Sequence, residues 1–256
     1  MTRMLIAVAT YNRPRITELA LANLKELKGP NDAIVVYDDG STAYDFAFLK
    51  RHADEVVRLG ANGGIERLRA RNFRDFVERY REFDLLYTTD NDVLHDPAFS
   101  SRLRQLYESH RLPDGRHLPV CIYNSLYHDR PQNIVGRGVD TTLRTTAPGV
   151  SQLYDREMAD IIVRGLAANP RLESMYGYDY HWPALLHRPF AQSETSYLEH
   201  FARDTFEGGL HARNSGAGEE ALADFERDRA INPTPYLQSI RPLIIDFILQ
   251  SARAVA

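Results

Sequence analysis

The sequence predicts an α/β domain in which helices flank a mostly parallel central sheet, with a smaller antiparallel portion in its second half. Short apolar runs alternate with amphipathic helical patterns over the first hundred residues, which is typical of strand–helix–strand units. Three of these apolar runs are followed at once by clusters of polar residues. With 256 residues, of which 43% are hydrophobic, the chain is long enough to bury a substantial core.

The first hundred residues predict strands that are buried on both faces, because their apolar runs are nearly continuous. These strands are predicted at residues 4–9, 33–37, 55–59 and 84–88. Apolar side chains at helical spacing predict helices at residues 14–27 and from residue 63 to about residue 81. Gly29-Pro30 ends the first of these helices.

The second half of the chain has a less regular pattern. A helix is expected from Pro97 to about His110, and a strand at residues 120–124. Residues 130–148 are rich in Gly, Thr and Arg and predict loops and short antiparallel strands. Residues 152–168 predict a strand that leads into a helix.

A last helix is predicted at about residues 235–253. Its apolar residues form a stripe that consists of Leu237, Ile240, Leu243, Ile244, Phe247 and Ile248. The preferred interpretation is that this stripe docks on the chain's own domain. A homodimer contact through the helix, or a role at a membrane surface, is the alternative.

Charge and cysteine usage narrow the function classes. The formal net charge of -4 gives no electrostatic case for a nucleic-acid partner. Cys121 is the only cysteine, so an intramolecular disulfide cannot form. The N-terminus lacks a signal-peptide pattern, and no apolar stretch is long enough to cross a bilayer. We therefore expect a soluble cytoplasmic protein, with peripheral attachment to a membrane left open.

Polar side chains gather where the apolar runs end. The clusters are Thr10-Tyr11-Asn12, Asp38-Asp39-Gly40-Ser41-Thr42 and Asp90-Asn91-Asp92. Because the carboxyl ends of parallel strands share one edge of a sheet, we expect the three clusters to converge there. Asp90 and Asp92 would present several oxygens to one hard cation, which predicts Mg²⁺ or Mn²⁺. The alternative is that these residues form a simple turn.

The helix after Gly63-Gly64 is rich in arginine. Its arginines are Arg67, Arg69, Arg71, Arg74, Arg79 and Arg81. Most of them must face water, but those in the first turns could reach a diphosphate at the strand edge. The chain has no Walker-type loop and no Gly-x-Gly-x-x-Gly after the first strand, which disfavours a P-loop ATPase and a dinucleotide dehydrogenase.

Four segments occur in a characteristic order over about the first hundred residues. They are Val8-Ala9-Thr10-Tyr11-Asn12-Arg13-Pro14, Val36-Tyr37-Asp38-Asp39-Gly40-Ser41, Asn62-Gly63-Gly64 with Ala70-Arg71-Asn72, and Asp90-Asn91-Asp92. Together they resemble the motifs of the family 2 inverting glycosyltransferases, which have the glycosyltransferase-A fold. The resemblance implies a donor site for a nucleotide sugar.

By this resemblance the donor-site residues are Thr10, Asn12, Asp38, Asp39, Asn62, Arg67, Arg71, Asp90 and Asn91. Within this set, Thr10, Asp38 and Asp39 would contact the nucleoside. Arg67 or Arg71 would assist the diphosphate or fix the helix, and the resemblance does not separate these two roles.

The resemblance also implies a metal site and a general base. Asp90 would touch the ribose or the metal, and Asp92 would ligate Mn²⁺ or Mg²⁺. Family members complete the metal site with a histidine after a short strand, a position that His200 fits better than its rival His211. At the start of an acceptor-side helix the family often has a Glu-Asp pair. Asp179 alone fits here and is expected to be the general base, the alternative being a helix cap.

The sequence thus predicts a metal-dependent inverting glycosyltransferase of hexosyltransferase type. Its donor would be a UDP- or GDP-sugar, and its acceptor a hydroxyl of a glycan, a lipid-linked molecule or a small molecule. The expected catalytic domain spans residues 1–212, with a nucleotide-sugar-binding half at 1–97, an acceptor half at 98–212 and a C-terminal helical extension at 213–256. A non-catalytic nucleotide-sugar-binding module and a sugar nucleotidyltransferase are the alternatives.

Overall fold

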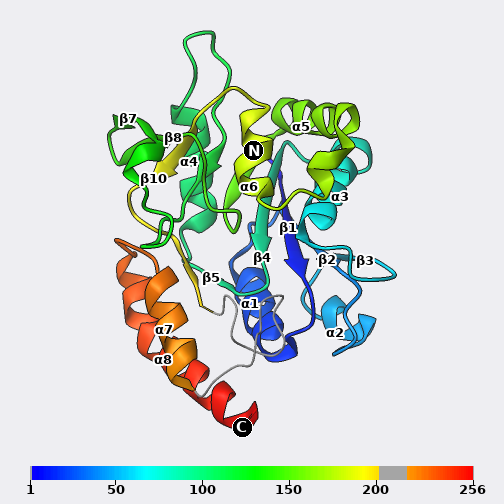
Figure 1. Ribbon diagram of the computed structural model, residues 1–256, viewed down its shortest axis with the longest axis vertical. Coiled ribbons are helices and arrows are strands. Elements are labelled where there is room, and N and C mark those ends of the chain that lie inside the picture. The colour runs from blue at the N-terminus through cyan, green and yellow to red at the C-terminus, as the bar shows by residue number, and fades with distance from the viewer. Residues whose placement is uncertain (1, 202–217, 256) are drawn as a thin grey trace.

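The structure is a computed structural model that describes residues 2–201 and 218–255. Within these residues a nine-stranded sheet has the strand order β3-β2-β1-β4-β9-β6-β10-β8-β7, and a two-stranded sheet pairs β11 with β5 (Figure 1). The strands are β1 (Met4–Thr10), β2 (Ala33–Asp38), β3 (Glu55–Arg58), β4 (Leu85–Asp90), β5 (Val93–His95), β6 (Val120–Cys121), β7 (Ile134–Gly138), β8 (Thr141–Arg144), β9 (Gln152–Asp155), β10 (Phe190–Ser193) and β11 (Leu198–His200).

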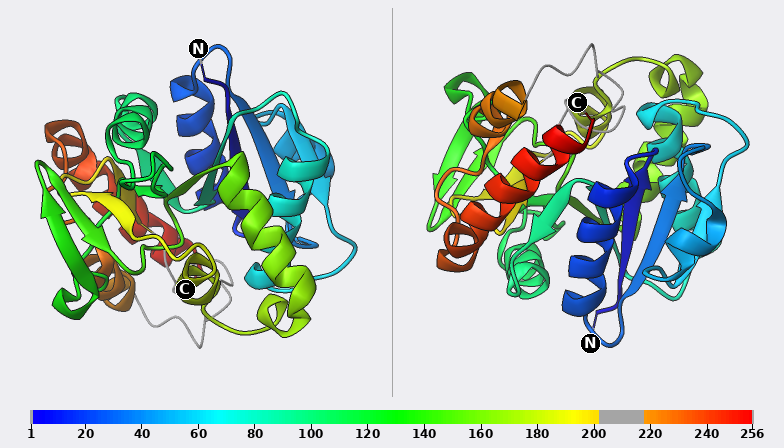
Figure 2. Two further views of the ribbon diagram at one scale, coloured as in Figure 1. Left: turned by 90° about the horizontal axis from the view of Figure 1, so that it is seen from above. Right: turned by 90° about the horizontal axis from the view of Figure 1, so that it is seen from below.

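Helices cover both faces of the large sheet. The α-helices are α1 (Pro14–Leu27), α2 (Phe46–Lys50), α3 (Ile65–Glu78), α4 (Phe99–Ser109), α5 (Arg156–Ala168), α6 (Tyr178–Ala184), α7 (Gly218–Asp228) and α8 (Pro235–Val255). Two short 3₁₀ helices, η1 (Pro131–Asn133) and η2 (Pro170–Glu173), lie in connecting segments. Helices α1 and α4 lie on one face of the sheet, and α3 and α5 lie on the other (Figure 2).

The two halves of the large sheet differ in strand direction, as expected. Strands β3, β2, β1 and β4 are parallel to one another. The second half is mixed, since β9 is antiparallel to both β4 and β6, β6 and β10 are parallel, and the β7–β8 hairpin adds antiparallel pairs. The predicted fold class, with parallel strands first and a smaller antiparallel portion later, is confirmed.

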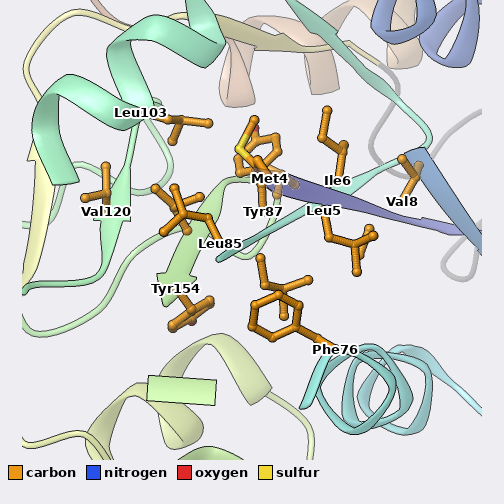
Figure 3. Close-up of a cluster of buried hydrophobic side chains, with 14 of the residues drawn as sticks. Met4, Leu5, Ile6, Val8, Phe76, Leu85, Tyr87, Leu103, Val120 and Tyr154 are labelled. Atoms are coloured by element: carbon orange, nitrogen blue, oxygen red, sulfur yellow. The ribbon is translucent and has the colours of Figure 1, made fainter. Parts of the chain in front are cut away.

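The central strand of the parallel half, β1, has no side that faces solvent. All seven residues of β1 are buried, because helices cover it from both directions. Leu103 of α4 and Phe76 of α3 lie on opposite sides of this strand, and the side chains of β1 fill the space between them (Figure 3). A continuous apolar run is therefore what a strand in the middle of this sheet requires.

One predicted strand is shorter in the structure. The strand expected at residues 120–124 contains only Val120 and Cys121. The backbone of Ile122 leaves the ladder, because its N–H donates to Ser151 Oγ at 3.3 Å and its carbonyl accepts from the Tyr197 N–H at 2.9 Å. The apolar run predicted burial correctly, since Ile122 is fully buried, but it did not predict strand pairing.

The C-terminal helices pack on the rest of the chain through a second apolar cluster. Its buried members are Ile16, Leu94, Phe201, Phe225, Ile244 and Ile248, which come from α1, β5, the residue after β11, α7 and α8. Three residues of the predicted α8 stripe, Leu237, Ile244 and Ile248, are buried within the chain, whereas Leu243 is 67% exposed. The interpretation that the stripe docks on its own domain is thus confirmed. A homodimer contact and a membrane-surface role stay predictions.

None of the helices in the described residues combines the length and the apolar composition that crossing a membrane requires.

His95 is a buried histidine of the small sheet. It is fully buried in β5, where its Nε2 lies 3.1 Å from the Tyr87 hydroxyl and its ring packs 4.7 Å from that of Phe99. Its Nδ1 is buried without a hydrogen-bond partner. Burial disfavours the charged imidazolium and lowers the pKa of His95 to about 3.

We expect His95 to make the stability of the fold depend on pH. The unfolded chain binds a proton at His95 below about pH 6.5, whereas the folded chain does not until about pH 3. The free energy of unfolding therefore falls as pH is lowered from 6.5, by up to about 1.4 kcal/mol per pH unit from this residue, and is unaffected above 6.5.

Urea denaturation at several values between pH 7 and pH 5 measures this slope. The variant His95→Gln should have a shallower slope than the parent protein. The exposed His187 provides the control, because His187→Asn should leave the slope unchanged. Equal slopes for the parent and His95→Gln would contradict the prediction.

Candidate active site

A cavity of about 300 Å³ opens where β1 and β4 end. Strand register aligns these ends, because Thr10 pairs with Asp38 of β2 and Ala9 pairs with Asp90 of β4. The turn after β1, the turn after β4, the start of α6 and the end of β11 all contribute side chains to the wall. The predicted convergence of strand ends is therefore present in the structure.

Asp92 lies at the centre of this site. Its Oδ2 accepts a hydrogen bond from Arg13 Nη1 at 2.8 Å, and its Oδ1 lies 3.2 Å from His200 Nε2. Each of the three side chains is 8% exposed or less. Burial alone would raise the pKa of Asp92, but the adjacent imidazole and guanidinium outweigh it and hold the pKa below its ordinary value.

A strained turn brings Arg13 to Asp92. Asn12 and Arg13 have φ values of 51° and 63°, in the left-handed region that residues other than glycine rarely adopt. Two hydrogen bonds hold this conformation, one from the Asn12 N–H to Ser41 Oγ at 2.7 Å and one from the Thr17 N–H to the Arg13 carbonyl at 2.9 Å. Such strain persists where the surroundings enforce it, often at functional sites.

Asp90 is paired with a second buried arginine. The guanidinium of Arg69 is fully buried and donates from Nη2 to Asp90 Oδ1 and to the Thr89 carbonyl, the latter at 2.8 Å. Burial raises the pKa of Asp90, although Arg69 opposes this effect. Asn91 is also fixed, because its Nδ2 donates to Thr17 Oγ1 at 2.7 Å. Side chains on both sides thus hold the acidic turn.

His200 is held from its other side by Asp228, the last residue of α7. Its Nδ1 lies 2.7 Å from Asp228 Oδ2. The two flanking carboxylates outweigh burial and raise the pKa of His200 well above its ordinary value. The Ser125 hydroxyl donates to Asp228 Oδ1 at 2.7 Å and accepts from His128 Nδ1 at 2.8 Å. Asp228 and His128 both line the cavity.

The residues fit a divalent cation that shares its coordination with substrate. Asp92 Oδ1 is buried without a hydrogen-bond partner and faces His200 Nε2. Within residues 2–201 and 218–255, however, no three His, Cys, Asp or Glu side chains form a group that could hold a metal ion alone. Mg²⁺ in proteins often uses one or two carboxylates and takes its other ligands from phosphates and water. The rival His211 lies outside the described residues.

The two aspartates at the end of β2, Asp38 and Asp39, differ in whether they line the cavity. Asp39 lines the cavity, and its carboxylate accepts from the N–H groups of Gly63 and Gly64 at 2.8 and 2.9 Å. Asp38 is fully buried behind it and does not line the cavity. Its carboxylate accepts from Ser41 Oγ and pairs with Arg58 Nε at 3.0 Å, and burial raises its pKa.

The other donor-site candidates divide in the same way. Thr10 lines the cavity, and its hydroxyl lies 2.7 Å from that of Tyr44. Asn12 and Asn62 lie outside the lining and stabilise loops, since their Oδ1 atoms accept backbone N–H groups from Thr42 and Gly64 at 2.9 and 3.0 Å.

Neither arginine that the resemblance singled out lines the cavity. Arg67 is exposed, and the exposed Arg71 pairs with Asp75 on its own helix at 2.8 Å. The structure instead brings Arg69 and Arg13 to the acidic turn. The signal for Arg69 is its spacing, because it lies four and seven residues before the buried Phe73 and Phe76 on the inner face of α3.

Asp179 lies in the first turn of α6 and lines the same cavity. Burial raises the pKa of its carboxyl above the ordinary value. Gly149 permits this approach, since a Cβ there would lie 2.3 Å from the Tyr178 hydroxyl and 3.3 Å from Asp179 Cβ. The cavity is therefore lined by an acidic turn with its histidine and by a separate carboxyl group from α6.

Removing the Arg69 guanidinium should destabilise the fold. Arg69→Met would leave Asp90 and the Thr89 carbonyl without their buried donor, which we expect to lower the free energy of unfolding by about 3 kcal/mol. The matched control is Arg67→Met, an exposed position two residues earlier, where the change should stay within about 0.5 kcal/mol. Chemical denaturation measures both, and equal effects would contradict the assigned role of Arg69.

Part of the sequence and the fold of the chain resemble known proteins. Residues 5–118 match the family model described as Glycosyl transferase family 2. No curated protein matches the chain. Among solved structures, S. aureus TarS 1-349 in complex with UDP-GlcNAc is similar, with 16% identity, a TM-score of 0.56 and coverage of 97% of this chain and 70% of that chain.

Two further TarS structures extend less far. The structure of S. aureus TarS 1-349 has 17% identity and a TM-score of 0.53, covering 77% of this chain and 60% of that chain. The structure of S. aureus TarS has 16% identity and a TM-score of 0.55, covering 77% of this chain and 36% of that chain. This chain therefore spans only part of the length of these proteins. At such identities the likeness concerns the fold. Residues 5–118 thus match glycosyl transferase family 2, as their motifs predicted, within a fold of the glycosyltransferase-A class.

Proposed function

We propose that this chain transfers a sugar from a nucleoside-diphosphate sugar to a hydroxyl acceptor, with a divalent cation bound at Asp92 and His200. The observation that carries the proposal is a single cavity, about 300 Å³ in volume, into which both residues and Asp179 project. The match of residues 5–118 to glycosyl transferase family 2 supports the same reaction class.

The donor in this proposal is a UDP-sugar. The TarS structures that resemble this chain were obtained with UDP and with UDP-GlcNAc, and the latter likeness covers 97% of this chain. The walls around Thr10 and Asp39 would receive the nucleoside, because both residues line the cavity at the ends of the parallel strands. A GDP-sugar is the alternative donor.

Arg13 is suited to bind the diphosphate of the donor. Its side chain is 6% exposed, and it lines the cavity beside Asp92. One of its nitrogens is bound to Asp92, whereas Nε and Nη2 are buried without hydrogen-bond partners. Buried donors of this kind are costly to leave unpaired, and phosphate oxygens are strong acceptors for a guanidinium.

Asp92 and His200 would hold the cation through Oδ1 and Nε2. A bound divalent cation supplies Lewis-acid stabilisation to the charge that develops on the leaving diphosphate. Arg13 keeps Asp92 ionised and in place, because its guanidinium pairs with the other carboxylate oxygen. Arg69 holds Asp90 in place and partly offsets the effect of burial on its pKa, and the other oxygen of Asp90 is left for the ribose or the cation.

Asp179, which lines the same cavity, would activate the acceptor. Its carboxylate would take the hydroxyl proton as the acceptor oxygen bonds to the anomeric carbon and the bond from that carbon to the diphosphate breaks. A direct displacement of this kind inverts the anomeric configuration. A carboxylate with a raised pKa is a stronger base than an exposed one, which suits this role.

Metal-dependent release of UDP tests the proposal. With a panel of UDP-sugars and candidate acceptors, UDP release should require Mn²⁺ or Mg²⁺. Asp92→Asn should lower the rate by about 10²–10³, because a carboxylate that stabilises the leaving group through the cation is lost. Asp160→Asn, on the outer side of α5, is the control and should behave like the parent protein. A chain that binds UDP-sugars but releases no UDP with any acceptor would instead be a binding module.

The role of Asp179 predicts a particular pH profile. The base works only when deprotonated, and burial raises its pKa above 3.8, so kcat/KM should decline on the acid side with a midpoint above pH 3.8. Asp179→Asn should reduce kcat by about 10²–10⁴ while calorimetry still finds donor binding at the parent affinity. If the variant retains kcat, or loses donor binding to the same extent, Asp179 is not the base.

A further inference from the structure

Asp228 connects the C-terminal segment to the centre of the cavity. It is the last residue of α7 and is fully buried. Both carboxylate oxygens have partners, since Oδ2 lies 2.7 Å from His200 Nδ1 and Oδ1 accepts from Ser125 Oγ at 2.7 Å. Its backbone carbonyl accepts from the Tyr123 hydroxyl. Asp228 thus has a fixed orientation that both its side chain and its backbone enforce.

We propose that Asp228 is a positioning residue for the cation site, because it fixes the tautomer and the direction of the His200 ring. The inference rests on the proposed function, in which Asp92 and His200 hold a divalent cation. The predicted domain boundary places α7 in a C-terminal extension that begins at residue 213, whereas this proposal makes the last residue of α7 part of the catalytic site.

The contact with Asp228 decides which ring nitrogen of His200 keeps its proton when a cation binds. An ionised carboxylate only accepts hydrogen bonds, so the His200 nitrogen that faces Asp228 at 2.7 Å must carry a proton. That nitrogen is Nδ1, so Nε2 is the ring nitrogen whose proton a cation would displace. Nε2 already faces Asp92 Oδ1 at 3.2 Å. Histidines that ligate metals commonly donate their second N–H to a carboxylate, which orients the ring and increases ligand basicity.

The segment after α7 is hydrogen-bonded to two other parts of the chain. The Ala230 N–H donates to Glu199 Oε1 at 2.6 Å, and Arg241 Nε of α8 donates to Glu199 Oε2 at 2.8 Å. The Ile231 N–H donates to the Asn124 carbonyl at 2.9 Å. These bonds attach the segment to the neighbour of His200 and to the loop that contains Ser125. These hydrogen bonds therefore hold the segment that follows Asp228 against the residues around His200.

Mn²⁺ binding to the protein, measured alone and with UDP bound, tests this role without measuring turnover. Titrations followed by the electron paramagnetic resonance signal of free Mn²⁺ give the dissociation constant. Asp228→Ala should weaken binding 10–100-fold relative to the parent, the usual effect of losing such a partner. Asp228→Asn keeps an acceptor for the Nδ1 proton and should recover part of the affinity. Glu226→Gln, two residues earlier on the same helix and 53% exposed, is the matched control and should bind like the parent.

The outcomes separate the two proposals. If the parent chain binds Mn²⁺ neither alone nor with UDP bound, the proposed metal dependence fails. If the parent binds Mn²⁺ and a folded Asp228→Ala binds it within twofold, Asp228 is only structural and the inference is wrong.

A measurement on the parent protein decides the matter even where Asp228→Ala does not fold. With Cd²⁺ as a diamagnetic substitute for Mn²⁺, ¹⁵N spectra should find the His200 proton on Nδ1 and the metal on Nε2. A proton on Nε2 of the Cd²⁺-loaded protein would overturn the inference.

Discussion

The site depends on the compensation of buried negative charge. Asp92 is almost completely removed from water, and an isolated carboxylate in such a place would be neutral. Arg13 and His200 keep it ionised from two sides, whereas Arg69 only partly offsets the effect of burial on the pKa of Asp90. Asp92 can therefore keep its charge before any ligand arrives, as the proposed cation site requires.

This compensation also explains why distant segments meet at one place. Arg13 comes from a left-handed turn after β1, Arg69 from the inner face of α3 and His200 from β11. Each of these cations would be costly to bury without the acidic turn, and the turn would be costly to bury without them. Two arginines, Arg13 and Arg69, thus pair with the acidic turn. The exposed Arg67 and Arg71 lie outside the cavity lining.

The sequence predicted the parallel half of the fold and the location of the site. Continuous apolar runs identified strands covered on both faces, and polar residues after them identified the shared edge, where Thr10, Asp39 and Asp92 line one cavity. Asp38 shows the limit of this rule. The pleat directs adjacent side chains to opposite sides, so only one of two successive aspartates faces the cavity, and the pattern does not say which.

Other members of the site left weaker traces in the sequence. Asp228 lies in the charged run Glu226-Arg227-Asp228-Arg229, which is typical of a solvated helix face, and its burial depends on packing against a loop a hundred residues earlier. His128 has no motif around it, and its place in the wall depends on Ser125. Contacts of this kind join residues that are far apart in the sequence, so no local pattern predicts them.

The pairing of β4 with β9, and of β9 with β6, has a mechanical consequence. It joins the two halves of the molecule in one uninterrupted hydrogen-bonded sheet, so a hinge between them would have to break backbone ladders. Asp92 lies just after β4, so the acidic turn is carried by this continuous sheet. A change in the shape of the cavity that leaves the ladders intact must therefore come from the loops and helices around it.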